Sequence, residues 1–283
     1  MSLSSLLGVI FGLLLVIGAV ALATSNPMIY LDWHAFLIVF GGAIAAAFMG
    51  YHSNDVITAF KAIVWMVKKP KSTREGLNTE IMRLIKWSYL VQQRGLPALE
   101  NEIKGVAVND PILRYCMELV ITNHTPAELR TMMVTAVESD FEHKTAAVPV
   151  LRNMGASAPS FGMIGTLVGL IAILNQMGSG AKNLPAVIGG GMSLALVATL
   201  YGVFFARLVF IPAANKLMQK EETERFRNLM VVEGLIMLAE KKTPRFMQDR
   251  LNSFLEPQHH FNIDKQLRGA KAAVAAAREA ATQ

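Results

Sequence analysis

The stretch "APSFGMIGTLVGLIAIL" at residues 158–174 sets the expected fold of the chain. It is almost entirely apolar, yet its proline and its three glycines lower the stability of a helix in water. In a lipid bilayer, by contrast, small residues let two helices approach closely. The stretch is therefore typical of a membrane-spanning helix with one flat face, and its central hydroxyl, on Thr166, needs a role.

Three further apolar runs accompany this stretch. The chain of 283 residues is 53% apolar and 17% charged, whereas a soluble domain has about a quarter charged residues. The four runs lie at residues 3–23, 30–51, 150–175 and 187–212. Each is about 20 residues or longer, which is enough to cross roughly 30 Å of hydrocarbon. The sequence predicts an all-α, polytopic membrane protein with four transmembrane helices, the first a retained span and not a cleaved leader.

The basic residues orient these spans. Of the 27 Lys and Arg residues, 12 lie between spans 2 and 3 and 12 follow span 4, but the loop at 24–29 has none and that at 176–186 has one. Positive charge stays on the cytoplasmic side, so we expect the long segments and both termini in the cytoplasm. Anionic lipid is a sufficient partner for this charge, and no nucleic acid is needed.

This topology divides the chain into five segments. The segment between spans 2 and 3 has apolar residues at helical spacing and no strand pattern, which predicts a helical cytoplasmic domain. Thr125 and Glu128 within it have the spacing of a capping box. The predicted segments are a hairpin of spans 1 and 2 (1–51), the cytoplasmic domain (52–149), a hairpin of spans 3 and 4 (150–212), cytoplasmic helices (213–256) and a flexible, basic, Ala-rich tail (257–283).

The sequence lacks the motifs of known enzymes. It has no phosphate-binding G-x-x-x-x-G-K-[ST] loop, no H-E-x-x-H and no G-x-S-x-G. Its single cysteine, Cys116, excludes an internal disulfide and a Cys-based metal site, and its place on an apolar helix face predicts a buried thiol. We therefore expect no enzyme activity, no cofactor and no bound metal.

Spans 3 and 4 have central hydroxyl groups but no acid. A cation transporter normally needs a carboxylate inside the membrane, and none of the four spans has an Asp or Glu in its interior. Thr166 and Thr199 lie near the middle of an antiparallel hairpin, so both are expected near the bilayer midplane and side by side. Gly165 and Gly169 line one face. We predict that this glycine face receives a helix from another chain, which brings the missing carboxylate.

Each of these residues also has a simpler alternative role. A threonine in a helix often donates its hydroxyl to the carbonyl four residues before it, and glycines often pack only their own hairpin. Arg207 lies inside span 4 near its cytoplasmic end, where its side chain is expected to extend to the lipid headgroups.

Three long stretches carry a resemblance to a known family. They are "LDWHAFLIVFGGAIAAAFMGY" (31–51), "APSFGMIGTLVGLIAIL" (158–174) and "ALVATLYGVFFARLVFIPAANKL" (195–217). They resemble the MotA/PomA family, the A subunit of the bacterial flagellar stator, and the likeness covers most of residues 1–255. Spans 3 and 4 alone also resemble the wider group with ExbB and TolQ, but four spans and a large domain between spans 2 and 3 favour the flagellar branch.

The resemblance implies a rotary motor in the bacterial inner membrane. Five A subunits surround the single transmembrane helices of two B subunits (MotB/PomB), and each B helix carries one aspartate. Ions pass between that aspartate and spans 3 and 4 of A, and the A ring turns around B. The cytoplasmic domain of A then pushes charged residues of the rotor protein FliG.

Family positions can be carried over to this chain. Pro159 and Pro212 match two prolines tied to the coupling of ion flow with movement, although each also has a plain role as a helix terminator or kink. Thr166 and Thr199 match polar pore positions, whereas Ala198 stands where some sodium-type members have a second threonine. Because sodium needs several oxygen ligands, the two hydroxyls slightly favour Na⁺ over H⁺.

The resemblance is less complete at the rotor contact. The stretch "QQRGLPALE" ends in Glu100, which matches the family glutamate. The family arginine position falls on Gln92, and Arg94 follows two residues later. Either Arg94 substitutes for the family arginine or this chain contacts its rotor differently.

Two other functions remain open at this stage. One is a proton-driven motor of the ExbB/TolQ type that energises the outer membrane. The other is a membrane scaffold or solute transporter that uses its threonines and glycines for packing only. A neighbouring gene for a single-span protein with a membrane aspartate and a peptidoglycan-binding domain would favour the stator.

Overall fold

The computed structural model is helical wherever it describes the chain. It describes residues 26–65, 75–99, 110–122, 124–180, 183–260 and 262, with a few positions before residue 25. These ranges contain helices and turns but no strand, which confirms the all-α class for them. The predicted tail falls almost entirely outside the described residues.

Contacts divide the chain into two compact units. Unit 1 comprises residues 1–70 and 144–221, and unit 2 comprises residues 71–143 and 222–283. The long helices α8 (Pro126–Thr145) and α11 (Ile211–Ala239) contain the boundaries between them.

Unit 1 contains the apolar helices. Its elements in chain order are a 3-10 turn (Pro27–Tyr30), α2 (Trp33–Phe36), a π-helical turn (Leu37–Gly41), α3 (Gly42–Gly50), α4 (Ser53–Trp65), α9 (Ala147–Gly178), α10 (Leu184–Phe204), a second π-helical turn (Phe205–Phe210) and the start of α11. Asp32 begins α2 because its carboxylate accepts the His34 and Ala35 N–H groups at 2.8 and 3.1 Å.

Within the part of the chain that the structure describes, three helical segments are long and apolar enough to cross a membrane. They are Pro27–Gly50, Pro126–Gly178 and Leu184–Ala239, and they contain the predicted spans 2, 3 and 4. Most of the predicted first span lies outside the described residues, so the count of four spans stays a prediction. Helix α4 lies in unit 1, where Val56 and Ala59 are buried with Ala147 and Leu151 of α9.

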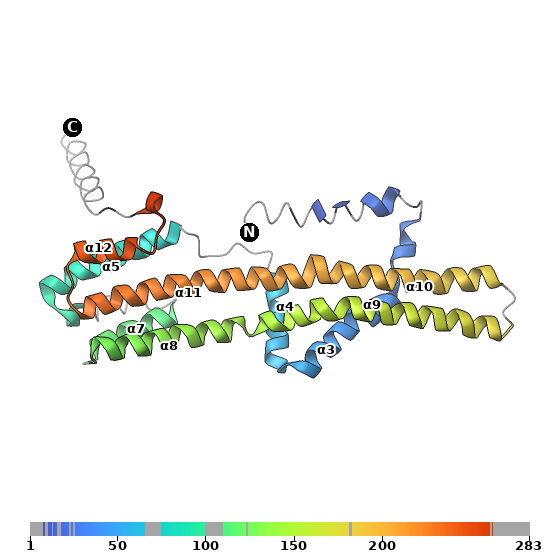
Figure 1. Ribbon diagram of the computed structural model, residues 1–283, viewed down its shortest axis with the longest axis horizontal. Helices are drawn as coiled ribbons and strands as arrows, with labels where there is room; N and C mark the ends of the chain where they lie inside the picture. Colours follow the sequence, from blue (N-terminus) through green and yellow to red (C-terminus); the bar gives the residue numbers. More distant parts are fainter. Residues whose placement is uncertain are drawn as a thin grey trace, which may run out of the picture. The chain divides into compact units, whose positions relative to one another are not determined.

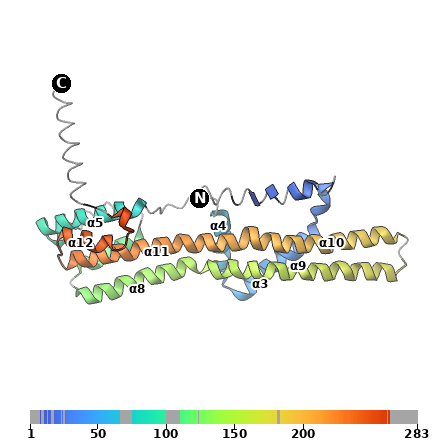
Figure 2. The ribbon, with the colours of Figure 1, turned by 45° about the horizontal axis from the view of Figure 1, so that its top comes forward.

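Helices α9 and α10 lie side by side and pack through their smallest residues (Figures 1 and 2). A Cβ atom on Gly169 would lie 2.6 Å from the Gly191 carbonyl oxygen, and one on Gly202 would lie 2.7 Å from the Ala158 carbonyl oxygen. The backbones therefore touch, as small residues allow in membrane helices. The prediction that the glycine face receives a helix from another chain is wrong, because α10, tethered by a short loop, already covers it.

Unit 2 is a helical domain with its own apolar core. It contains α5 (Glu75–Arg94), α7 (Pro111–Ile121), most of α8, the rest of α11 and α12 (Pro244–Asn252). The predicted capping box is confirmed, since the Glu128 carboxylate accepts the Thr125 N–H at 2.9 Å and the Thr125 hydroxyl accepts the Glu128 N–H at 3.4 Å. Cys116 is buried as predicted, and burial raises the pKa of its thiol to about 12.

Ion pairs connect the helices of unit 2. Arg227 of α11 lies 2.9 Å from the Glu80 carboxylate and 2.8 Å from that of Asp110, which also caps α7. Glu233 accepts hydrogen bonds from Arg130 and Arg250. Burial raises the pKa of the Glu233 carboxyl, but the two guanidinium groups outweigh burial and lower it overall. These charged residues of unit 2 are thus paired within the unit.

The backbone contact between α9 and α10 predicts the effect of adding one methyl group. Gly202→Ala places a Cβ against backbone atoms that cannot rotate away, so we expect a loss of about 1–3 kcal/mol of stability, as for overpacked cores. Gly189→Ala in the same helix is the matched control, because a Cβ there meets nothing within 4 Å. Thermal unfolding of the detergent-solubilised protein measures both. Equal midpoints for the two variants would contradict the packing described here.

Candidate functional site

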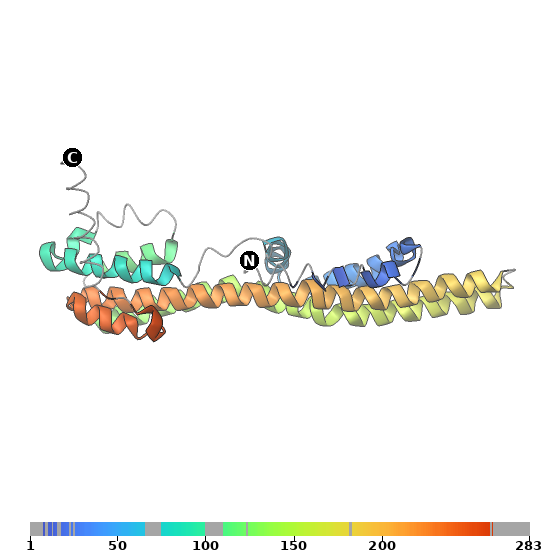
Figure 3. The ribbon, with the colours of Figure 1, turned by 90° about the horizontal axis from the view of Figure 1, so that it is seen from above.

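Span 2 covers one side of the α9–α10 hairpin. Phe161 of α9 lies against Gly42, and the Tyr201 hydroxyl of α10 donates to the Tyr30 carbonyl at 2.6 Å. The ring of Phe205 lies 5.9 Å from that of Phe36. Figure 3 shows the same arrangement, with α2, α3 and α4 on one side of the hairpin. Phe161, Tyr201 and Phe205 therefore mark the covered side.

The opposite side of the hairpin is open. On α10 and the following turn, the exposed residues between 191 and 210 recur at helical spacing and form one stripe: Met192, Leu196, Thr199, Leu200, Val203 and Arg207. On α9, Met163 and Leu167 are 60% and 58% exposed. No described residue of unit 1 covers these side chains. We call this surface the open side.

Both predicted threonines border the open side. Gly162 and Gly165 face α10, and a step of about 100° per residue places Thr166 on the flank away from Phe161. A Cβ on Gly162 would lie 3.2 Å from the Thr199 Cα, so Thr199 is level with Gly162. Thr166 is four residues further along α9. The two threonines thus share one side of the hairpin but lie about one turn apart, not directly beside each other.

Both threonine hydroxyls donate to their own helices, as the simpler alternative predicted. The Thr199 hydroxyl donates to the Ala195 carbonyl at 3.2 Å, four residues before it. The Thr166 hydroxyl donates to the Met163 carbonyl at 2.6 Å, three residues before it. These bonds use the hydroxyl protons but leave lone pairs on both oxygens. Each oxygen can therefore still bind a cation or accept a hydrogen bond from a neighbouring protonated acid.

Gly165 and Ala198 lie inside the hairpin, where they contact each other. They set the separation of the two helices at the level of the threonines. Their assignment to an ion pathway stays a prediction.

The two prolines lie within continuous helices, so neither terminates a helix, whereas the alternative role as a kink and the coupling role stay predictions. Pro159 lies in the middle of α9, where Gly202 packs closely against its Cα. Pro212 lies two residues after the end of the π-helical turn, and the Ile211 N–H between them donates to the Ala206 carbonyl five residues before it. This wider turn changes the hydrogen-bond pattern just before Pro212, which has no N–H. The helix can therefore continue past the proline.

The predicted rotor contact is described only in part. Gln92 and Arg94 are exposed in the last turn of α5, and a 3-10 turn at Leu96–Ala98 follows. Glu100 lies outside the described residues. The pairing of Arg94 with a rotor stays a prediction.

The open side offers an incomplete ion site. It has two hydroxyl oxygens, but α9, α10 and the π-helical turn after α10 contain no Asp or Glu. Among the described residues, no group of three or more His, Cys, Asp and Glu side chains is placed to hold a metal. A cation in a low-dielectric region needs a counter-charge, so a complete site needs a carboxylate from outside this part of the chain.

The chain is similar to known motility proteins over most of its length. A sequence model of the MotA/TolQ/ExbB proton channel family matches residues 105–228. The chain is 29% identical to chemotaxis protein PomA of Vibrio alginolyticus, over 94% of this chain and all of that protein. It is 26% identical to motility protein A of Borreliella burgdorferi, over 95% of this chain and all of that protein.

Solved structures show the same fold. The structure superposes on a chain of C. jejuni MotAB with a TM-score of 0.79 at 24% identity, covering 93% of this chain and all of that one. For the flagellar MotAB stator complex of Bacillus subtilis, the TM-score is 0.73 at 25% identity, covering 88% of this chain and 96% of that one. Residues 105–228 thus match the MotA/TolQ/ExbB proton channel family, and the chain is similar over most of its length to PomA and motility protein A.

Proposed function

We propose that this protein is the ion-conducting, torque-generating A subunit of a bacterial flagellar stator. The observation that carries the proposal is the open side, which places two hydroxyl oxygens on an apolar surface that lacks an acid. Full-length similarity to motility protein A and PomA supports it. The relatives are motor subunits and not enzymes, in agreement with the absence of enzyme motifs.

The partner that fits the open side is a single transmembrane helix of a MotB/PomB-type B subunit. Its aspartate would supply the counter-charge at the level of Thr166 and Thr199. An ion that binds there neutralises the charge of the carboxylate. Without a net charge, the carboxylate attracts its polar partners on the A subunit less strongly in a low-dielectric region. The B helix is then released to move on to the next A subunit, and repeated binding turns the ring.

The remaining features of the proposal follow the family. The A subunits form a ring, with five copies around two B subunits, in the inner membrane, with both termini in the cytoplasm. The exposed Arg94 at the end of α5, with Glu100, would contact the rotor protein FliG. Because two hydroxyls are available and sodium needs several oxygen ligands, Na⁺ is favoured over H⁺ as the driving ion.

A motor of the ExbB/TolQ type is the second candidate function. The family match favours it to some extent, because that family includes TolQ and ExbB as well as MotA. The length of the similarity to motility proteins favours the flagellar assignment. The gene next to this one separates the two, since a TonB- or TolR-like neighbour would support the second candidate.

Deletion of the gene tests the function as a whole. We expect cells that do not swim but carry normal numbers of filaments, because torque is lost and assembly of the filament is not. Swimming assays and filament counts by electron microscopy measure the two properties. Cells that still swim in a strain without a second stator would contradict the proposal.

Substitution of Thr199 tests the ion pathway. Thr199→Val keeps the shape and removes the oxygen, so one ligand worth about 1.4 kcal/mol is lost and the ion concentration for half-maximal speed rises about tenfold. Thr58→Val is the matched control, because Thr58 also donates to a carbonyl four residues before it but lies on α4, away from the open side. Unchanged swimming of the Thr199 variant at equal membrane level would remove this residue from the pathway.

External sodium tests the identity of the ion. At fixed pH we expect swimming speed to rise with sodium concentration and to saturate, because the ion occupies a site of limited affinity. Potassium at equal ionic strength is the control for general salt effects. A speed that stays flat with sodium but changes with external pH would identify protons as the driving ion.

A further inference from the structure

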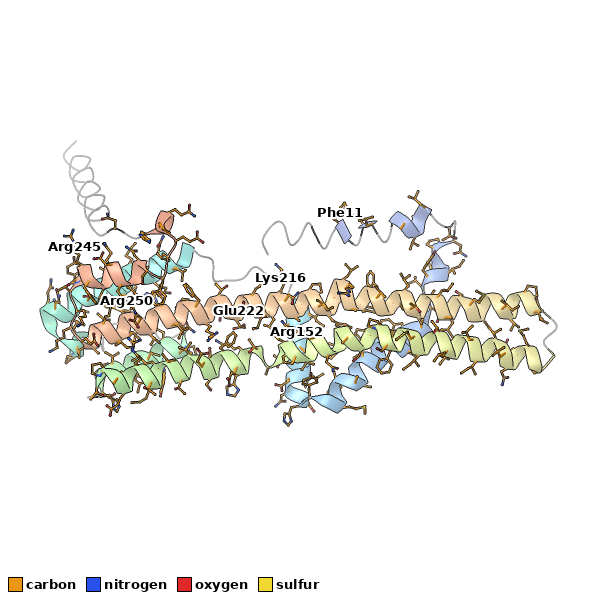
Figure 4. The ribbon with its side chains drawn as sticks, viewed as in Figure 1. Phe11, Arg152, Lys216, Glu222, Arg245 and Arg250 are labelled. Carbon is orange, nitrogen blue, oxygen red and sulfur yellow. The ribbon has the colours of Figure 1, made fainter. Side chains whose placement is uncertain are left out.

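The cytoplasmic end of the open side carries two arginines. Arg207 continues the exposed stripe of α10, since Thr199, Val203 and Arg207 are each four residues apart. On α9, Arg152 is exposed and lies 11 residues before Met163, which is close to three helical turns. Figure 4 labels Arg152 on this helix. Both arginines therefore share the side of the hairpin on which the threonines lie.

The packing of α9 against α10 shows that these two arginines lie at similar positions along the axis of the hairpin. Gly162 is level with Thr199, and a Cβ on Gly155 would lie 2.8 Å from the Ile211 side chain. Arg207 lies between these two levels. Arg152 follows about one turn further toward the cytoplasmic end. The long side chains of two arginines one turn apart can reach a common anion.

The two arginines differ from those of unit 2 in having no carboxylate partner. Six described arginines of unit 2 pair with Asp or Glu: Arg83, Arg114, Arg130, Arg225, Arg227 and Arg250. Among the residues that the structure describes, no Asp or Glu pairs with Arg152 or Arg207. Arginine in a membrane segment normally has an acidic partner, a headgroup or water.

A helix that covers the open side would displace two of these three kinds of partner, the lipid headgroup and water. If a B helix packs along the stripe, as proposed above, water and lipid headgroups leave the Arg207 side chain. An unpaired guanidinium is unfavourable in such a place, whereas a carboxylate can accept two parallel hydrogen bonds from it. The partner helix then needs an acid at the height of Arg207.

We propose that Arg207, with Arg152, binds a second carboxylate of the B subunit, separate from the one that binds the ion. Arg207 is eight residues from Thr199, so this acid lies about 12 Å on the cytoplasmic side of the ion-binding acid. The contact sets the register and the direction of the partner helix against α9 and α10. This inference rests on the proposed function, because it assumes that the open side receives the B subunit.

Substitution at Arg207 in the co-expressed complex tests the contact. We expect R207Q to reduce recovery of the B subunit on affinity-tagged A by about tenfold or more, because a desolvated acid is left unpaired. R207K keeps the charge but cannot donate the two parallel hydrogen bonds, so we expect a loss of recovery that is smaller than that of R207Q. R114Q is the matched control, since Arg114 pairs with Glu118 on the exposed surface of α7 in unit 2. Swimming speed of the same strains is the second measurement.

Expression of the A subunit alone separates binding from folding. If R207Q lowers the membrane level of A equally with and without B, the arginine serves the hairpin itself and the proposal is overturned. If R207Q retains B and swims normally, its contact is a lipid headgroup or water, which overturns the proposal as well. The stator assignment is separate, since it fails only when the deletion strain swims.

Charge reversal identifies the partner acid. R207E should lose the B subunit, and one Asp or Glu to Arg substitution in the B span or its cytoplasmic flank should restore both recovery and swimming. A loss that none of these substitutions restores would contradict a direct pair.

Discussion

The backbone contact between α9 and α10 is the constraint on which the functional surface depends. Because Gly169 and Gly202 bring the two helices to within contact of each other's carbonyl oxygens, the hairpin has one rotational setting about each helix axis. That setting points Phe161 and Tyr201 toward span 2 and leaves Thr199 on the other side. A larger residue at the contact would rotate or separate the helices, and the two threonine oxygens would no longer share a surface.

Local features of this fold could be predicted from the sequence, but the direction of its faces could not. The helical class, the Thr125–Glu128 cap and the buried Cys116 depend on residues within one or two turns, so patterns along the chain were sufficient. The back-bonded threonines are local too. The helix that covers a glycine face is the nearest tethered neighbour. In this chain α10, and not a helix of a partner, covers the glycine face of α9. Pro212 does not end its helix, because the π-helical turn before it lets the helix continue.

The polar groups of unit 2 and those of the open side differ in whether they have partners, and this difference indicates an interface at the open side. In unit 2, Arg227 and Glu233 each contact two partners of opposite charge, so the charges are satisfied within the chain. On the open side of unit 1, oxygens with free lone pairs and an arginine without a carboxylate lie among exposed apolar residues. An apolar surface with polar groups that lack partners suits association in a membrane, where each such group gains most from a complementary one.

The position of Arg207 links this surface to the place where the helix is least regular. It lies inside the π-helical turn Phe205–Phe210, and Pro212 follows that turn. Turns of this kind are frequent at functional sites, and a proline removes one further backbone bond. A force applied to the guanidinium by a moving partner helix would therefore act where the backbone of the helix resists bending least. The threonines, by contrast, lie in regular helix beside the close glycine contact, so the ion site would stay in place while the segment beyond it moves.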